Sequence, residues 1–181
     1  MAAFTLVELL VVVSVLAILL SLAVPAFSRF TASLRIRTEA SKLMSAVHLA
    51  RSEAIKRNRK VSLCPYNSEV SPAACTRDYA DGWVVFVNPD RDRELDEGEQ
   101  LLARGSALTT GLTVSNRKGN RAADELITYY GDGSSRRNLT LMVCSTAHPG
   151  VESWSVVLNL VGRPRMARGW GECPTEALPG G

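Results

Sequence analysis

The chain has 181 residues, of which 46% are hydrophobic, and a formal net charge of +3. This length argues against two full domains and fits one domain with an accessory segment. The small net charge identifies no partner by itself. The charges are unevenly spread, because nine Lys and Arg residues lie between positions 29 and 60, whereas acidic residues gather between positions 69 and 99.

An uncharged apolar segment lies near the N-terminus. From Leu9 to Ser28, 20 consecutive residues carry no charge and are mostly Leu, Val, Ile and Ala. As a helix this run spans about 30 Å, the thickness of a bilayer hydrocarbon core. A secretory signal would need a basic start and a shorter apolar core, and Met1-Ala2-Ala3 contains no Lys or Arg. We therefore expect a transmembrane helix over residues 4–28.

One carboxylate stands at the start of this segment. Glu8 follows Thr5 by three residues, which is the spacing of a helix capping box. A carboxylate in a membrane helix is costly and usually has a partner or a function. Glu8 is therefore either a helix cap or a functional residue.

The helical pattern continues beyond the membrane segment. Apolar residues recur at spacings of four and three, which predicts one helix from Phe4 to Arg59 with an apolar stripe facing a globular domain. Pro25 removes a backbone donor and is expected to kink this helix. The stripe consists of Ile36, Ala40, Leu43, Val47, Ala50 and Ala54, and Met44 and Ile55 are expected to widen it.

Beyond Lys60 the apolar runs become short, β-rich and bounded by turn residues. The sequence therefore predicts an α+β protein, in which a long N-terminal transmembrane and amphipathic α-helix (4–60) packs on a small C-terminal β-sandwich-like domain (61–181). The expected strands are 61–64, 83–87, 101–104, 112–115, 126–130, 139–144, 153–160 and a last one near 165–167.

The four cysteines favour disulfides. Cys64, Cys75, Cys144 and Cys173 contain no close CxxC pair, so a zinc site is the weaker reading. Of the three possible pairings, Cys64–Cys75 with Cys144–Cys173 closes the shorter loops and is favoured. Because disulfides persist in oxidising compartments, the domain is expected outside the cytoplasm.

The N-terminal residues Phe4-Thr5-Leu6-Val7-Glu8-Leu9-Leu10, followed by a long apolar helix, resemble the signature of type IV pilins and type II secretion pseudopilins. In those families a prepilin peptidase cuts before the aromatic residue and methylates its new amino group. The glutamate then pairs with the N-terminal amine of a neighbouring subunit. The resemblance implies a leader over residues 1–3, cleavage after Ala3, methylation of Phe4 and an assembly role for Glu8. The usual residue before the cut is glycine, where this chain has Ala3.

The domain residues narrow the resemblance. Cys64-Pro65, Cys75, Gly82-Trp83-Val84-Val85-Phe86 and an acidic stretch ending in Glu97-Gly98-Glu99 are similar to the GspH/FimT family. That family covers minor pilins of type IV pili and minor pseudopilins of type II secretion. It implies a pilin fold, other pilin subunits as partners, and a single-pass inner-membrane protein with a periplasmic domain that later joins an extracellular filament.

The basic residues after the apolar run favour the opposite membrane topology. Arg29, Arg35 and Arg37 follow the apolar run, and the positive-inside rule alone would leave the domain in the cytoplasm. The cysteines and the family resemblance outweigh it.

Catalysis, metals and cofactors are not expected. An EF-hand loop starting at Asp90 would need glycine at 95 and glutamate at 101, where the chain has Leu95 and Leu101. The interleaved Arg91 and Arg93 further favour a solvated hairpin loop. The chain has two histidines and contains no GxSxG, Walker A or zinc-hydrolase pattern, so it does not read as an enzyme.

An arginine-rich element, Gly162-Arg163-Pro164-Arg165-Met166-Ala167-Arg168, follows a strong predicted strand. Guanidinium groups match phosphate geometry, and Arg163 and Arg165 at alternate positions could project to one side. The element resembles the GRxR motif associated with DNA binding in FimT-type minor pilins of naturally transformable bacteria. The implied DNA-binding residues are Gly162, Arg163, Arg165 and Arg168, with Arg117, Lys118, Arg136 and Arg137 as weaker candidates.

Two functions stay open at this point. The first is a minor pilin of a type IV pilus that binds extracellular DNA nonspecifically, through backbone phosphates, for uptake in natural transformation. The alternative is a structural minor pilin or an H-type type II secretion pseudopilin that primes filament assembly without binding DNA. In that case the arginine element is a turn with solvated side chains.

Overall fold

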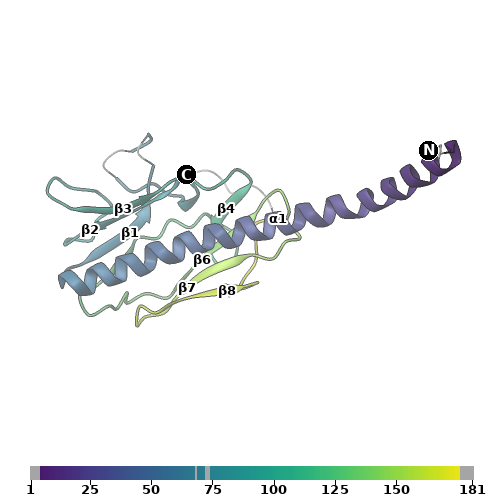
Figure 1. Ribbon diagram of the computed structural model, residues 1–181. Coiled ribbons are helices and arrows are strands. Elements are labelled where there is room, and N and C mark those ends of the chain that lie inside the picture. The colour runs from purple at the N-terminus through teal and green to yellow at the C-terminus, as the bar shows by residue number, and fades with distance from the viewer. Residues whose placement is uncertain (1–4, 68, 72–73, 176–181) are drawn as a thin grey trace.

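The computed structural model describes residues 5–67, 69–71 and 74–175. One long helix, α1 (Leu6–Arg57), precedes all the strands. Its N-terminal half projects freely, and its C-terminal half lies along the globular domain (Figure 1). The strands are β1 (Val61–Pro65), β2 (Trp83–Val87), β3 (Leu101–Gly105), β4 (Leu112–Ser115), β5 (Ile127–Tyr129), β6 (Leu139–Ser145), β7 (Trp154–Leu158) and β8 (Pro164–Arg168), with a short 3₁₀ helix, η1, at Tyr79–Asp81.

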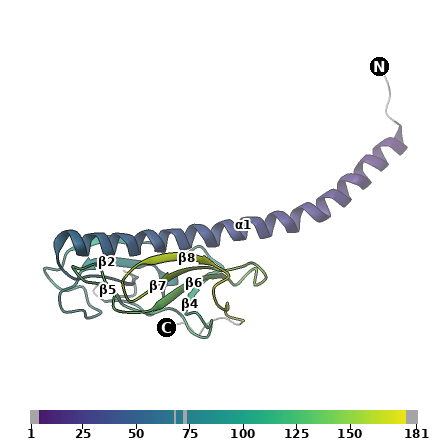
Figure 2. The same ribbon diagram turned by 90° about the horizontal axis from the view of Figure 1, so that it is seen from below.

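The strands form two four-stranded antiparallel sheets, ordered β3-β2-β1-β5 and β4-β6-β7-β8. Helix α1 lies across both sheets (Figure 2), so one helix face closes a core shared by the two. All eight predicted strands are present, most within two residues of their expected bounds. The α+β fold class is therefore confirmed.

The predicted helix stripe faces this core. All six of its residues, from Ile36 to Ala54, are buried. Met44 packs against the same core, but the expectation that Ile55 widens the stripe is wrong, because its side chain is 49% exposed. The carboxylate of Glu39, beside this stripe, is also buried, and it accepts a 2.9 Å bond from Lys42 Nζ. That ion pair offsets the cost of burying the carboxylate.

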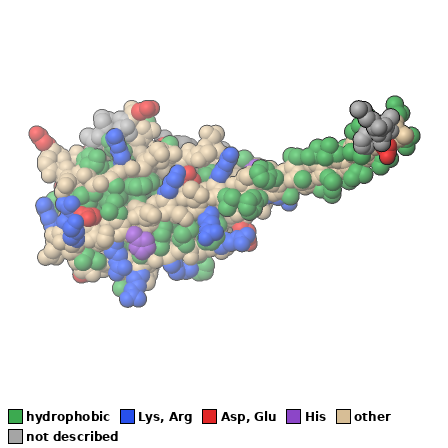
Figure 3. All heavy atoms as spheres, in the orientation of Figure 1, with side chains coloured by type: hydrophobic (Ala, Val, Ile, Leu, Met, Phe, Trp, Pro, Cys, Tyr) green, Lys and Arg blue, Asp and Glu red, His purple; other side chains and the backbone are tan. Residues whose placement is uncertain are grey.

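The apolar half of α1 has no partner in the described chain. Its large side chains from Leu6 to Phe30 are exposed, and Figure 3 shows them as a nearly continuous apolar surface on the projecting helix. By length and composition this helix could cross a membrane. The helix runs through Pro25 without interruption. The N-terminal half curves gradually away from the domain (Figure 2), where the sequence predicted a kink.

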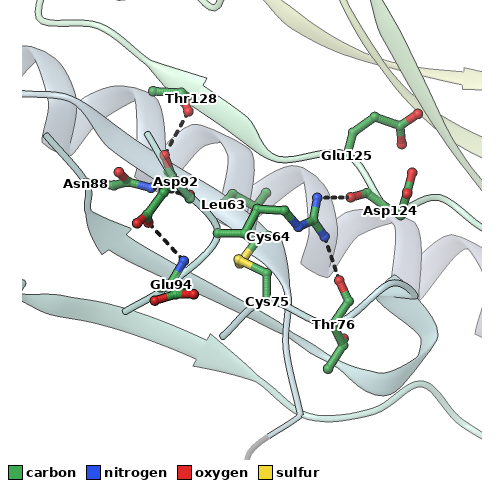
Figure 4. The surroundings of a disulfide bond; sticks show 12 residues. Leu63, Cys64, Cys75, Thr76, Asn88, Asp92, Glu94, Asp124, Glu125 and Thr128 are labelled. Carbon is green, nitrogen blue, oxygen red and sulfur yellow. Dashed lines mark hydrogen bonds between the residues drawn. A yellow bond between two sulfur atoms is a disulfide. The ribbon is translucent and has the colours of Figure 1, made fainter. Parts of the chain in front are cut away.

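Two disulfides tie loops to strands, in the predicted pairing. Cys64–Cys75 joins β1 to the segment that leads into η1 (Figure 4). Cys144–Cys173 joins β6 to the C-terminal segment after β8. The second bridge holds residues 169–175 against the outer face of their sheet, the face turned away from α1.

Candidate nucleic-acid interface

The arginine element begins in a tight turn between β7 and β8. Gly162 has a φ of 78°, a conformation that favours glycine, and its amide donates to Asn159 O at 2.9 Å. A Cβ at Gly162 would lie 2.2 Å from Gly133 O, so the close approach also requires glycine. The Arg163 amide donates to Asn159 Oδ1 at 2.9 Å, which fixes the next residue, while its side chain remains exposed.

The strand that follows separates two of the predicted residues. Arg165 pairs with Val157 and Arg168 pairs with Trp154 in the β7–β8 ladder. Because side chains alternate between the faces of a strand, Arg168 shares the face of Trp154, which lies 5.4 Å from Arg37 of α1. Arg165 therefore lies on the outer face. Arg168 is also engaged, since its Nε lies 2.6 Å from Glu152 Oε2. Arg168 therefore lies on the opposite face of β8 from Arg165, and its role in DNA binding stays a prediction.

On the outer face, Arg165 meets a second arginine through an aromatic ring. Its guanidinium carbon lies 4.7 Å from the centroid of the Trp170 ring, and that of Arg117 lies 4.4 Å from the same centroid. Trp170 belongs to the disulfide-bound C-terminal segment, and its carbonyl accepts a 3.3 Å bond from Ser155 Oγ. The structure thus brings Arg117, a weaker sequence candidate, to the main motif.

We call Arg117, Lys118, Arg163, Arg165 and Trp170 the outer-face cluster. None of its cationic residues takes part in an ion pair of the described chain. Glu172 is the acidic side chain beside it, in a hollow that Arg117 and Lys118 also line. The cluster therefore presents mostly uncompensated positive charge, which suits an anionic ligand.

Arg136 and Arg137 line a different hollow from this cluster. Arg136 is next to the β7–β8 turn, where its amide donates to Leu160 O at 3.1 Å. The Arg137 guanidinium instead reaches Leu126 O at 3.3 Å, beside β5 of the other sheet. These two arginines line a separate pocket with Arg91 and Tyr130.

The acidic stretch forms the connection between the paired strands β2 and β3, as expected of a hairpin loop. Asp92 organises it, because its carbonyl accepts from Asn88 Nδ2 at 3.0 Å and its carboxylate from the Glu94 amide at 2.9 Å (Figure 4). Carboxylate oxygens of Asp90, Asp92 and Asp96 lie within 4.8 Å of one another. All three side chains are exposed, the ordinary state of acidic residues at a surface.

The N-terminal candidates are only partly described. The predicted cleavage site, Ala3 and Phe4, lies outside the described residues. Glu8 forms the complete capping box: its Oε2 accepts from the Thr5 amide at 3.1 Å, and the Thr5 hydroxyl accepts from the Glu8 amide at 3.3 Å. The cap is confirmed, and the assembly role of Glu8 stays a prediction.

We compared the sequence and the fold with those of known proteins. A family described as "Type II transport protein GspH" matches residues 39–162, more than half of the chain. No curated protein matches the sequence significantly.

Solved structures share the fold at low sequence identity. One crystal form of the type IV minor pilin FimU from Pseudomonas aeruginosa is 18% identical, with a TM-score of 0.58 over 76% of this chain and 92% of FimU. A second form, also 18% identical, has a TM-score of 0.54 over 72% and 91%. The minor pseudopilin EpsH of Vibrio cholerae is 13% identical, with a TM-score of 0.51 over 74% of this chain and 97% of EpsH. The family match and this shared fold make the chain a member of the GspH/FimT family of type IV pilin-like minor pilins and pseudopilins, which are structural subunits associating with other pilins rather than enzymes.

Proposed function

We propose that this subunit binds DNA nonspecifically through the outer-face cluster. The observation that carries the proposal is the convergence of Arg117 and Arg165 on Trp170, beside the exposed Arg163. Planar guanidinium groups held against a ring lose less freedom when they bind than free side chains do. Such a surface is suited to the evenly spaced phosphates of a nucleic acid backbone.

The chemistry of the cluster favours phosphate contacts over base recognition. Arg163 and Arg165 lie on a turn and a strand rather than on a helix that could enter a major groove. The exposed side chains of the cluster are mostly cationic, and Arg and Lys supply many of the contacts that proteins make to backbone phosphates. We therefore expect weak, salt-sensitive binding without sequence preference, as uptake of arbitrary extracellular DNA in natural transformation requires.

The N-terminal helix supplies the filament role. The apolar half of α1 and the family fit anchoring in the inner membrane with a periplasmic domain. We propose that prepilin peptidase removes residues 1–3 and methylates Phe4, and that Glu8 then pairs with the terminal amine of a neighbouring subunit. Both charges are costly in lipid when unpaired, and their contact satisfies both. The subunit would then leave the membrane as part of an extracellular type IV pilus.

The second candidate is a purely structural minor pilin or type II secretion pseudopilin. It is favoured by the family description and by the pairing of Arg168 with Glu152, which shows that part of the arginine element is internally neutralised. On this view α1 alone carries the function, through contacts with other subunits.

Direct binding separates the two. The full-length protein in nonionic detergent is titrated into fluorescently labelled 30-base-pair duplexes of two unrelated sequences, and anisotropy is recorded at low salt. DNA binding predicts saturable curves with equal affinity for both sequences. A flat response at micromolar protein would leave the structural role.

A further inference from the structure

A second basic site lies on the outer face of the other sheet, at its β5 edge. It is a pocket of about 410 Å³, within the range of small-ligand sites. Its lining is three arginines, an aromatic ring, two hydroxyl residues and one leucine: Arg91, Arg136, Arg137, Tyr130, Thr128, Ser135 and Leu126. We call it the Tyr130 pocket.

Two of its arginines have unusual backbone conformations. Arg91 has a φ of 72° and Arg136 a φ of 54°. Among the described non-glycine residues, the only other positive φ belongs to Asn58, which caps α1. Such a conformation is uncommon for arginine and costs of order 1 kcal/mol or more. Strain of this kind gathers at functional sites, so its occurrence twice around one pocket points to a ligand.

Both strained arginines are directed onto one ring. The guanidinium carbon of Arg136 lies 4.1 Å from the Tyr130 centroid, and that of Arg91 lies 6.0 Å from it. Arg91 Nη1 also donates to the Tyr130 hydroxyl at 2.7 Å. The ring therefore holds two like charges near each other, an arrangement that an anion between them would stabilise.

Hydrogen bonds hold the backbone at two of these arginines and the side chain of the third. The Arg91 amide donates to Asn88 Oδ1 at 2.5 Å, and the Arg136 amide donates to Leu160 O at 3.1 Å. Arg137 is anchored through Leu126 O. The pocket is thus built from three separate segments of the chain.

The positive charge of the pocket is not neutralised by close ion pairs. None of the six side-chain ion pairs in the described chain includes Arg91, Arg136 or Arg137. Asp132 is a nearby acidic residue. Hydrogen bonds from Ser134 are the main cause of its lowered pKa, and the positive charge of Arg136 lowers that pKa by a smaller amount. Its carboxylate is already occupied by the Ser134 amide and hydroxyl, at 2.9 and 2.7 Å.

We infer that the Tyr130 pocket is a phosphate-binding site. Three guanidinium groups offer more donors than one carboxylate can accept, whereas a phosphate presents several oxygens to all three. The phosphate could belong to a nucleic acid backbone or to a free phosphate ion, which share this chemistry. The pocket and the outer-face cluster have different lining residues, although Arg136 and Ser135 hydrogen-bond to the β7–β8 turn that carries Arg163.

The test is calorimetric titration of the full-length protein, in nonionic detergent, with inorganic phosphate. In parallel, anisotropy is measured with a 30-base-pair duplex lacking terminal phosphates. The variant is Arg136→Asn with Arg137→Gln, because asparagine tolerates the positive φ that position 136 requires. We expect its phosphate affinity to fall roughly tenfold, the loss of at least one charge-assisted contact.

The matched control is Arg77→Gln with Arg104→Gln, two exposed arginines outside the pocket, which removes the same charge. If duplex affinity also falls in the pocket variant, the site accepts backbone phosphate; if only phosphate binding falls, it accepts the free ion. Wild-type protein that shows no heat with phosphate and a variant with unchanged duplex affinity would overturn the inference. Replacing Arg163 and Arg165 should leave the phosphate heat intact, so failure of the outer-face proposal is seen separately.

Discussion

Arg165 and Trp170 lie against each other, with the guanidinium carbon 4.7 Å from the ring centroid. Arg165 lies on β8, whereas Trp170 lies in the segment after that strand. This segment is held by the Cys144–Cys173 disulfide, three residues beyond Trp170. The position of the central arginine therefore depends on a segment that has no strand of its own. Because of this dependence, the proposed DNA surface can be tested by substitutions that leave every arginine in place.

The first prediction replaces the ring. In Trp170→Leu both cation–π contacts are lost, each worth about 0.5–1 kcal/mol at an exposed site. We expect duplex affinity to fall about threefold to tenfold, since Arg117 and Arg165 become mobile. Trp154→Leu is the control, because Trp154 stacks with Arg37 on the opposite face. Equal losses in both variants would remove the role of Trp170.

The second prediction concerns the bridge that holds this segment. Replacing Cys144 and Cys173 together by serine should lower the free energy of unfolding by roughly 3–4 kcal/mol, as for a loop of this length. Urea unfolding measures that loss. The same variant should also bind duplex more weakly, because Trp170 is released. Replacing Cys64 and Cys75 should cost similar stability and leave DNA binding unchanged in protein that remains folded, and the opposite pattern would contradict the account.

The third prediction compares two buried tyrosines. The Tyr79 hydroxyl bonds to the Leu63 and Glu125 carbonyls at 3.1 and 2.9 Å. The buried Tyr129 hydroxyl has no hydrogen-bond partner among the described residues. Tyr79→Phe should therefore destabilise by about 1–2 kcal/mol, whereas Tyr129→Phe should be neutral or stabilising. Thermal melts at neutral pH distinguish them, and a larger loss in Tyr129→Phe would be the contrary result.

The same tyrosines predict alkaline sensitivity. Burial raises the pKa of Tyr129 to about 12 and that of Tyr79 well above its usual value. Because the folded state then holds these protons more tightly than the unfolded state, their contribution is complete below about pH 10 and is lost as pH rises through the folded pKa. The melting temperature should fall between about pH 10 and 12. A weaker fall is expected in Tyr79→Phe, and an identical fall would assign the effect to other groups.

Much of the fold was predictable because local patterns carry it. The stripe from Ile36 to Ala54 repeats with helical period, and the strands are short apolar runs between turn residues. The burial of Glu39 was not predictable from a hydrophobic pattern, because it depends on the ion pair with its neighbour Lys42. Tyr79 was missed for the opposite reason, since it stands alone between loops and enters the core through η1.

The candidate sites depended more on long-range contacts. Arg165 and Arg168 are three residues apart on one strand, so alternation alone could have separated them. The role of Trp170 was harder to predict from the sequence. Its nearness to Cys173 indicated only that the favoured disulfide would hold it close to the sheet. Arg91 was read with its acidic neighbours in the sequence, because nothing local shows its positive φ or its contact with Tyr130.

A further prediction separates the two roles of Glu8. Glu8→Gln keeps an acceptor for the capping box but removes the charge, so helix formation should be preserved. Incorporation into filaments should nevertheless fall, because the neighbouring amine loses its counter-charge in lipid. Immunoblots of sheared filaments and of membranes measure incorporation and insertion. Normal incorporation would leave Glu8 as a helix cap alone.

The most direct test of the DNA-binding proposal is the salt dependence of duplex affinity. Each phosphate contact releases condensed counterions, so the logarithm of the association constant falls linearly with the logarithm of salt concentration. If Arg163 and Arg165 each contact a phosphate, replacing both by Gln should weaken binding and flatten that slope by about two units. Stability should change by no more than about 0.5 kcal/mol per site, because both side chains are exposed. The charge-matched Arg77→Gln, Arg104→Gln variant should keep the wild-type slope. A slope and affinity unchanged in the Arg163, Arg165 variant would contradict the account and leave the chain a structural filament subunit.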